Sequence, residues 1–328
     1  STILMIKKGF IIIYLNNPGN KNKIFINQKN KTGGIHMVEV QKLSSCSLEE
    51  VTKLWNDGFS DYSVNIKSSV DDFIRRFALD SLSADYSYIA YSRGEPAGLL
   101  LNGFKNMNGI LCSWNGGTVV LPQYRGKGIG KCLMDATMSL YREHGVQLAS
   151  LEVLTTNQNA IDLYQKYGYE SEQKLITLEC TGLLTTSDKP VQHNKYQLQF
   201  GLPSDISTID FYDNHAPWQS QWVNLTNSQS LTIRDQDGTI ACYVLFKNTL
   251  NEPVANKSIR LIQCVLNPSI QAADAIIEIA LHEIFKPGIT CRRFAGDFVT
   301  RDERVVHHLE RLGFIPKSER YLMFKRFG

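Results

Sequence analysis

The sequence predicts an α/β (α+β) fold, a mixed sheet flanked by helices, and predicts that this architecture occurs twice along the chain. Segments with strand-like alternation are interleaved with segments of helical periodicity throughout. A length of 328 residues is long for one compact domain and comfortable for two. The second half also repeats the element order of the first, because Leu312-Gly313-Phe314 mirrors Tyr167-Gly168-Tyr169 before a last strand.

In the first half, an alternating strand is expected at 37–43. Ser47 with Glu50, and Ser69 with Asp72, have the spacing of helix-capping pairs, so we expect helices from 47 to about 58 and from 69 to about 79. The following elements are strands at 86–91, 97–104 and 110–121, a helix after a glycine-rich turn, a strand at 148–154, a helix at 158–167 and a final strand.

A linker is expected at 181–195, where the sequence TGLLTTSDKPVQHNK has the composition of an irregular connection. Beyond it the pattern predicts strands at 197–200, 231–234, 240–247, 258–266, 291–298 and from 315 to about 324, and helices at 204–214, 270–285 and 301–312. The expected domains are therefore 37–180 and 196–328. An unrelated α/β domain is the alternative interpretation of the second half.

Residues 1–36 form an extension rich in lysine and asparagine. One interpretation is a β-hairpin of the IIIYL and KIFIN segments. The other, which we favour, takes Met37 as the natural start and Lys31-Thr-Gly-Gly34 as a translated ribosome-binding sequence, so that 1–36 would not be native. The segment also makes the net charge of the whole chain more positive, because it holds six lysines and no acidic residue.

Composition excludes several classes of protein. The net charge of +3 becomes −3 without residues 1–36, since 29 basic and 32 acidic residues remain, which argues against a nucleic-acid partner. No apolar run approaches the roughly 20 residues of a membrane span, so no membrane partner is expected. The seven cysteines form no Cys-x-x-Cys pair, which favours reduced thiols in a cytoplasmic protein and no metal site.

The most informative motif is Gln123-Tyr-Arg-Gly-Lys-Gly-Ile-Gly130, which stands between a strand and a helix. Glycines at such a turn let an anion approach the N–H groups at the positive end of the helix. The spacing does not fit a Walker P-loop, because Lys131 is followed by Cys132, and Gly126, Gly128 and Gly130 do not fit a dinucleotide fingerprint. The alternative is a tight turn that only needs glycine.

Further motifs follow this turn at a consistent spacing: Leu151-Glu-Val153, Asn157-x-x-Ala160-x-x-Leu163-Tyr164 and Tyr167-Gly168-Tyr169. Together with QYRGKGIG, they make the chain resemble the GNAT superfamily of acetyl-CoA-dependent N-acetyltransferases. The resemblance implies acetyl transfer to a primary amine of a small molecule or peptide, by direct attack with general base and acid assistance. A non-catalytic CoA-sensing or scaffold protein of the same fold is the alternative. Sheets of this family often pair between subunits, so the resemblance also allows a homodimer.

The resemblance further implies which residues hold acetyl-CoA as cosubstrate. The pantetheine arm would pair with the strand at Val119, Val120 and Leu121, and Asn157 would hold the arm unless it only caps the next helix. The N–H groups of the turn would hold the pyrophosphate, from residues Arg125, Gly126, Lys127, Gly128, Ile129, Gly130 and Lys131. The matching turn of the second half, Pro268 to Ala275, lacks these glycines and carries Asp274, so that half is interpreted as a degenerate GNAT-like domain.

Two residues match catalytic positions of the family. Tyr164 is the candidate general acid, and a packed aromatic residue is the alternative. Glu152 is the candidate base, with an ion pair to a nearby Arg or Lys, or a water chain as base, as alternatives. For the acceptor amine, family pockets use the loop between the first two helices and the strand before the turn. This implies Asp61, Tyr62 and Asn115, each of which is equally a loop or turn residue.

Overall fold

The computed structural model describes residues 2–7, 10–15, 23–29, 35–61, 67–107, 109–184, 195–253, 256–299 and 303–328. Tyr62 and residues 185–194 of the expected linker lie outside these ranges. Contacts divide the chain into two units. The first comprises Ser1–Leu151, Gln158–Glu170 and Met323–Gly328, and the second comprises Glu152–Asn157 and Ser171–Leu322.

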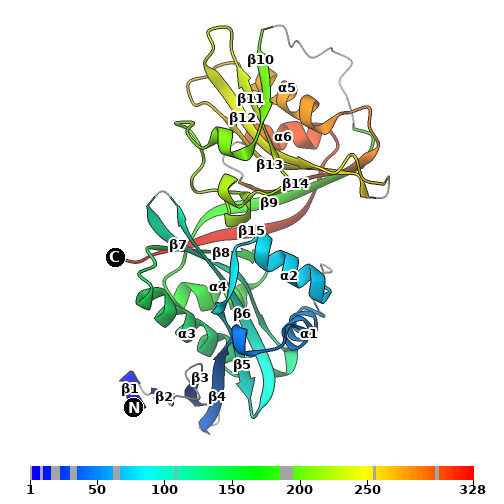
Figure 1. The fold of residues 1–328 in the computed structure, drawn as a ribbon. Coiled ribbons are helices and arrows are strands. Elements are labelled where there is room, and N and C mark those ends of the chain that lie inside the picture. The colour runs from blue at the N-terminus through cyan, green and yellow to red at the C-terminus, as the bar shows by residue number, and fades with distance from the viewer. Residues whose placement is uncertain are drawn as a thin grey trace. The chain divides into compact units, whose positions relative to one another are not determined.

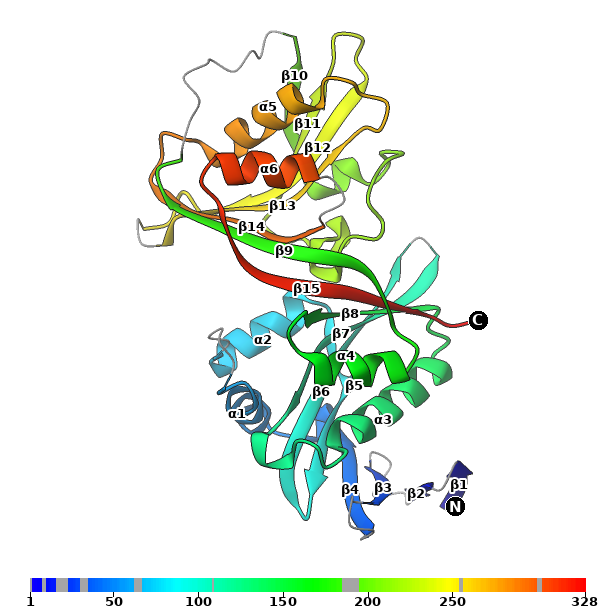
Figure 2. The ribbon, with the colours of Figure 1, turned by 180° about the vertical axis from the view of Figure 1, so that it is seen from behind.

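The first unit is built on a sheet with helices on both faces (Figures 1 and 2). Its elements are β4 (Ile35–Lys42), α1 (Leu48–Gly58), α2 (Val70–Leu79), β5 (Leu82–Ser92), β6 (Glu95–Met107), β7 (Ile110–Val120), α3 (Ile129–Glu143), β8 (Leu148–Leu154) and α4 (Gln158–Lys166). The strands from β4 to β7 pair antiparallel in chain order, and β8 pairs parallel with β7. Helices α1 and α2 lie on one side of the sheet, and α3 and α4 lie on the other.

Both predicted helix-capping pairs are present. Ser47 accepts a hydrogen bond from the N–H of Glu50, and Ser69 accepts one from the N–H of Asp72. The Asp72 carboxylate in turn accepts a hydrogen bond from the N–H of Ser69. Helix α3 packs across β5 and β6 with a face of fully buried side chains, which include Leu133, Met134, Thr137 and Tyr141. These local signals fix where α1 and α2 begin and which face of α3 meets the sheet.

Three further strands precede β4: β1 (Thr2–Lys7), β2 (Phe10–Leu15) and β3 (Lys23–Lys29). Strands β2 and β3 pair antiparallel, from Ile12↔Ile26 to Tyr14↔Ile24, which is the hairpin interpretation that we did not favour. Strand β3 also pairs along the whole of β4, and Ile26 is 1% exposed. In this arrangement the edge of β4 is covered.

The second unit repeats the plan with six further strands and two long helices. They are β10 (Gln197–Gly201), β11 (Gln229–Arg234), β12 (Ile240–Asn248), β13 (Ser258–Leu266), α5 (Ala273–Phe285), β14 (Cys291–Val299), α6 (Glu303–Arg311) and β15 (Ile315–Arg326), with β9 (Glu170–Gly182) running into the unit. Strands β10 to β13 pair antiparallel, and β13 pairs parallel with β14. Helices α5 and α6 bury one apolar side against the sheet.

The predicted helix at 204–214 is wrong. Only Pro203–Ile206 forms a short 3-10 turn, and the chain then continues through turns. Asp213 explains part of this outcome, because its side chain accepts the N–H of His215 at 3.0 Å while its own N–H donates to the Tyr243 hydroxyl at 2.9 Å. Aspartate favours such side-chain turns over continued helix.

The last strands do not follow the expected domain boundaries of 37–180 and 196–328. In the first unit, the end of β15 runs beside β8, where the Phe327 N–H donates to the Gln147 carbonyl at 2.9 Å. In the second unit, β9 pairs antiparallel with β14, from Cys291↔Gly182 to Val299↔Leu175. Each unit therefore contains a strand from the other half of the sequence.

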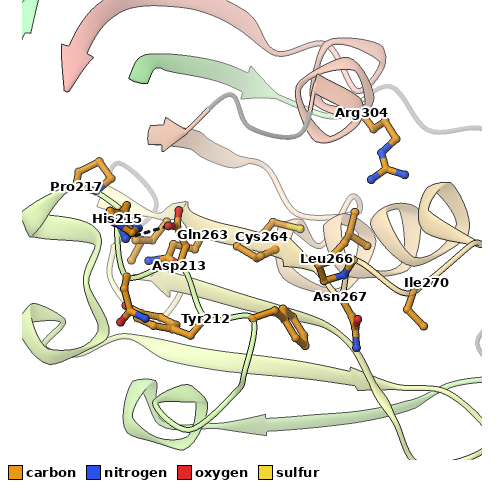
Figure 3. Close-up of a pocket in the computed structure, with 16 residues that line it drawn as sticks. Tyr212, Asp213, His215, Pro217, Gln263, Cys264, Leu266, Asn267, Ile270 and Arg304 are labelled. Carbon is orange, nitrogen blue, oxygen red and sulfur yellow. Dashed lines mark hydrogen bonds between the residues drawn. The ribbon is translucent and has the colours of Figure 1, made fainter. Parts of the chain in front are cut away.

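A cavity of about 650 Å³ lies in the second unit (Figure 3). Its walls are the end of β13 and the residues just after it, the loop from Phe211 to Pro217, and Arg304 in the first turn of α6. A further pocket lies beside α6 and is lined by Lys174, Asp274 and His308, among others.

Candidate functional site

Strand β7 has an open edge at its C-terminal end. Its parallel pairing with β8 runs from Cys112↔Leu148 to Asn115↔Leu151, whereas β7 itself continues to Val120. The Leu121 N–H donates to the Ala97 carbonyl of β6 at 2.9 Å. Because backbone groups alternate sides along an antiparallel strand, those of Thr118 and Val120 point away from β6. Of the three residues predicted to pair with the pantetheine arm, Val120 faces this open side, whereas the backbone groups of Val119 and Leu121 face β6. Thr118 was not predicted.

A β-bulge at Gly116 precedes this open edge. The Asn115 side chain holds it, because its amide donates to the Thr118 hydroxyl at 2.9 Å and its oxygen accepts the Gly117 N–H at 3.0 Å. Asn115 is 5% exposed, so the structure gives it a bracing role beside its predicted place near the acceptor. From α2, the Arg76 guanidinium donates to the Gly116 carbonyl.

Arg76 and Trp55 were also missed, since no local pattern marks them. The Arg76 guanidinium lies 4.3 Å from the centre of the Trp55 ring, within range of a cation–π contact. Burial lowers the pKa of Arg76 below its ordinary value, partly offset by Asp80. The Trp55 ring in turn lies so close to Gly117 that a Cβ there would come within 2.7 Å of it. Glycine at 117 is thus required by this close approach.

The glycine-rich turn joins β7 to α3. Gly126 and Gly128 have φ angles of 71° and 80°, the left-handed region that glycine enters without strain. Gly128 is the residue at the N-cap of α3, so the first helical N–H groups, from Ile129 onward, point out of the helix start. The N–H groups of Arg125 and Lys127, which were predicted to hold the pyrophosphate, instead donate to the carbonyls three residues before them, those of Pro122 and Tyr124.

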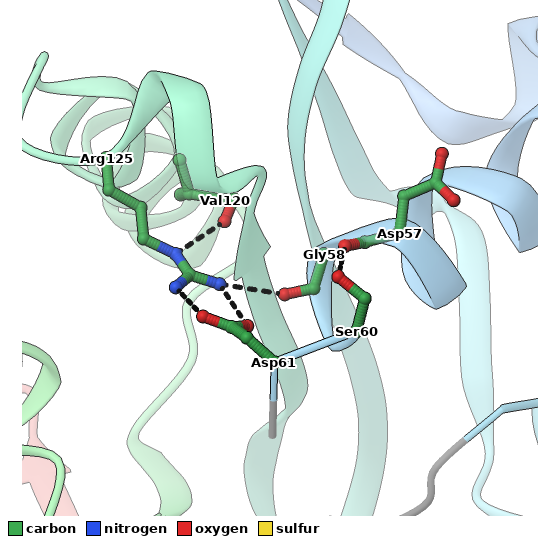
Figure 4. Close-up of polar contacts among 6 residues, drawn as sticks. All are labelled: Asp57, Gly58, Ser60, Asp61, Val120 and Arg125. Atoms are coloured by element: carbon green, nitrogen blue, oxygen red, sulfur yellow. Dashed lines mark hydrogen bonds and ion pairs between the residues drawn. The ribbon is translucent and has the colours of Figure 1, made fainter.

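The side chain of Arg125 turns back toward the end of α1 (Figure 4). Its Nη2 donates to Asp61 Oδ1 at 2.9 Å and to the Gly58 carbonyl at 3.0 Å, and its Nη1 donates to Asp61 Oδ2. Its Nε donates to the Val120 carbonyl at 3.1 Å. Hydrogen bonding with Arg125 is the main cause that holds the pKa of Asp61 below its ordinary value. Asp61 and Arg125, predicted for different ligands, are therefore brought together.

Helix α4 is fixed to the start of α3. The Tyr167 hydroxyl lies 2.7 Å from Asp135 Oδ1 and 3.0 Å from the Lys131 carbonyl, and Lys131 pairs with Asp135 at 3.1 Å. Burial is the main cause that raises the pKa of Tyr167. These contacts set the position of Tyr164, which is 6% exposed on α4.

The Tyr164 ring packs edge-on against that of Tyr169, with ring centres 6.1 Å apart. Tyr169 is itself buried, and burial raises its pKa well above the ordinary value. Both interpretations of Tyr164, a packed aromatic residue and a proton donor, are compatible with this position. Asn157 immediately precedes α4 and its N–H donates to the Leu154 carbonyl at 2.9 Å.

Glu152 forms an ion pair. Its Oε2 lies 3.0 Å from Arg320 Nη1, and the glutamate side chain is 8% exposed. Arg320 stands on β15 and also donates to the Thr177 hydroxyl at 3.1 Å. The ion pair accounts for a buried acidic side chain in an apolar strand, because an uncompensated charge there is costly.

The described residues contain no group of three or more His, Cys, Asp or Glu side chains arranged to hold a metal ion. Within the same ranges, no helix is both long enough and apolar enough to cross a membrane.

Residues 48–169 match the model of the acetyltransferase (GNAT) family. Over 81 residues, the chain is 32% identical to a thialysine N-epsilon-acetyltransferase of Sus scrofa, a match that covers 23% of this chain and 48% of that protein. The chain thus spans about half the length of the curated relative that it matches.

Two solved structures share the fold over most of the chain. One is the GCN5-related glucosamine N-acetyltransferase region of a fungal multi-domain GH3 beta-N-acetylglucosaminidase, with a TM-score of 0.62 and 16% identity, covering 88% of this chain and 38% of that chain. The other is a tandem GNAT protein from the clavulanic acid biosynthesis pathway, with a TM-score of 0.54 and 12% identity, covering 89% of this chain and 99% of that chain.

Proposed function

We propose that this chain is an acetyl-CoA-dependent N-acetyltransferase, because residues 48–169 match the model of the acetyltransferase (GNAT) family. The acceptor is a primary amine on a small molecule or a peptide. The active centre lies within residues 37–180, and residues 196–328 form a degenerate GNAT-like domain.

One observation carries the proposal: the open edge of β7 leads directly into the turn at Gly128. An acyl-CoA molecule has an amide-bearing pantetheine arm joined to a diphosphate, so it needs a strand edge followed by an anion site. The backbone groups of Thr118 and the N–H of Val120 suit the amides, and the first N–H groups of α3 suit the diphosphate. Gly128 has a φ of 80°, so any residue with a side chain at this position would strain the backbone.

Acetyl-CoA supplies the activated acyl group as a thioester when it is bound. The residues of this chain orient it and move protons. The resemblance to the family gives Tyr164 the task of protonating the departing thiolate, and burial next to Tyr169 would keep the hydroxyl shielded from water. Asn157 would steady the pantetheine arm.

The amine must lose a proton before or as it attacks. Glu152 is the residue we propose as base, acting while paired with Arg320. The ion pair fixes the direction of the carboxylate, which a base requires. Arg320 is then a positioning residue, contributed by β15.

The acceptor would enter near Asp61, Tyr62 and Asn115. Asp61 offers a carboxylate to an ammonium group, and its pair with Arg125 holds it in place. Asn115 holds the bulge of β7 through its hydrogen bond with the Gly117 N–H. The relative named for thialysine makes lysine-like amines the first compounds to try.

The first experiment is titration calorimetry of the full chain with acetyl-CoA. We expect one site per chain, weakened at least tenfold in Gly128→Asp because the substitution adds a Cβ and a negative charge at the diphosphate position. Gly94→Asp is the matched control, since Gly94 has a similar φ of 82° with open space around it.

Turnover is then measured as CoA thiol released with a panel of lysine-like amines and short peptides, and the product is weighed by mass spectrometry. Acetylated amine supports the proposal. Tight binding without thiol release by any amine would identify a CoA-sensing or scaffold protein instead, and no binding would overturn both.

A further inference from the structure

The second unit keeps the strand geometry of the first. Its β13 has a bulge at Ile262, and its parallel pairing with β14 ends at Leu261↔Ala295 although β13 continues to Leu266. The Asn267 N–H donates to the Ala241 carbonyl at 2.8 Å, on the β12 side. By the alternation of an antiparallel strand, the backbone groups of Cys264 and Leu266 point to the other side, where the strand edge is open.

The diphosphate site has not been kept. The turn from Pro268 to Ala272 has no glycine, and Ala272 caps α5 without a side-chain hydrogen bond. Asp274 stands in the first turn of α5, where it pairs with His308 at 3.0 Å. The hydrogen bond with His308 is the main cause that lowers the pKa of Asp274, so its carboxylate stays charged near the helix start. A second anion is disfavoured there.

The cavity of about 650 Å³ opens at this strand edge and carries charges of both signs. Asp213 and Arg304 lie on different sides of the lining, as Figure 3 shows, and the apolar side chains of Leu266 and Ile270 also belong to it. This volume is in the range of small-molecule sites. The lining therefore offers a carboxylate, an open strand edge, an apolar surface and a guanidinium.

We propose that this cavity binds a short peptide with free ends, of the dipeptide class. The ammonium group pairs with Asp213, the carboxylate with Arg304, and the single amide with the backbone of Cys264 or Leu266. An apolar second side chain packs on Leu266 and Ile270. The site is separate from the acetyl-CoA site, and its occupancy does not depend on the activity of the first unit.

The test is titration calorimetry of the full chain without acetyl-CoA, carrying Asp61→Asn, which removes the carboxylate that we propose for an acceptor amine in the first unit. The probe is L-alanyl-L-leucine. We expect saturable binding, weakened at least tenfold when the amine is acetylated and at least tenfold when the carboxylate is amidated.

Asp213→Asn keeps the oxygen that accepts the His215 N–H and removes only the charge, so it is the cleanest variant. We expect it and Arg304→Gln each to weaken binding at least tenfold. Asp237→Asn in the β11–β12 turn and Arg311→Gln on α6 lie outside the cavity lining and serve as matched controls. Circular dichroism melting confirms that each variant is folded.

Three outcomes would overturn the proposal: no binding of the dipeptide, equal binding of the capped dipeptides, or variants that bind as the unaltered chain does. Pantetheine is titrated in parallel, because it has an amide chain without charged ends. Binding of pantetheine without binding of L-alanyl-L-leucine would also overturn it.

Discussion

Arg125 and Asp61 form a two-point ion pair that joins the glycine-rich turn to the segment after α1. Nitrogen–oxygen distances of 2.5 and 2.9 Å connect the two side chains, and the same guanidinium reaches the carbonyl of Gly58. The turn is the proposed cofactor side of the site and the segment is its proposed acceptor side. Movement of one is thereby coupled to the other.

The first prediction concerns the titration of Asp61. Its folded pKa lies below the ordinary 3.8, because Arg125 hydrogen-bonds its charged form. A depressed carboxyl pKa means that the pair contributes its stabilisation above pH 3.8, and that the contribution is lost as the pH falls through the folded value. NMR of the Asp61 carboxyl carbon will show a midpoint below 3.8 that returns toward 3.8 in Arg125→Gln. An unmoved midpoint would contradict the pair, and Arg142→Gln is the control.

The second prediction concerns Tyr164. Removal of its hydroxyl in Tyr164→Phe will lower kcat by about 10²- to 10⁴-fold, the range of general acid catalysis, and leave acetyl-CoA affinity nearly unchanged. Steady-state kinetics and calorimetry together measure this split. Tyr169→Phe, which removes the hydroxyl of the neighbouring buried ring, is the control and should keep full kcat. Equal losses in the two variants would assign Tyr164 to packing alone.

The third prediction separates the two roles of Glu152. If it is the base, Glu152→Gln will lower kcat by about 10²-fold or more and abolish the rise of kcat with pH. Arg320→Gln will lower kcat less and keep a pH-dependent rise, because the carboxylate remains. Glu319→Gln, at the exposed neighbour that pairs with Lys174, is the control. Recovery of activity in the Glu152→Gln, Arg320→Gln double variant would show that only the ion pair matters.

The fourth prediction concerns Arg293, which is fully buried and binds main-chain carbonyls instead of a carboxylate. Among them are those of Phe285 at 2.9 Å and Lys286 at 3.1 Å, at the end of α5, and that of Gly182 at 2.7 Å. Arg293→Met leaves these carbonyls without their donor and will lower the free energy of unfolding by about 3 kcal/mol.

Urea denaturation measures the effect of Arg293→Met. The adjacent Arg292 is the matched control, because it is exposed and pairs with Glu179 at the surface. Arg292→Met will cost less than about 1 kcal/mol. Similar losses in both variants would mean that the buried carbonyl contacts contribute no more than a surface ion pair.

The sequence predicted most of the fold because most of its signals are local. Capping side chains at Ser47 and Ser69 start α1 and α2 where expected, and the strand at 148–154 has the predicted bounds. The tandem GNAT architecture is confirmed by the family match at 48–169 and by the two solved structures that share the fold.

What the sequence could not predict depends on distant partners. Arg125 and Asp61 are 64 positions apart, and Glu152 and Arg320 are farther still, so no periodicity or spacing connects them. The positions of β9 and β15 have the same cause, since each of these strands contacts a segment that is far away in the sequence. The prediction of a helix at 204–214 was wrong in part because the Asp213 side chain stabilises a turn by accepting the His215 N–H.

The place of β15 has a consequence for how the protein is made. Residues Met323–Gly328 complete the first unit, yet the ribosome synthesises them only after all of the second unit. Until then the backbone of Gln147 lacks the donor that Phe327 brings. The first unit therefore cannot complete its fold until the second unit has been synthesised. A chain that ends at residue 195 would leave β8 as an exposed strand edge, which favours aggregation.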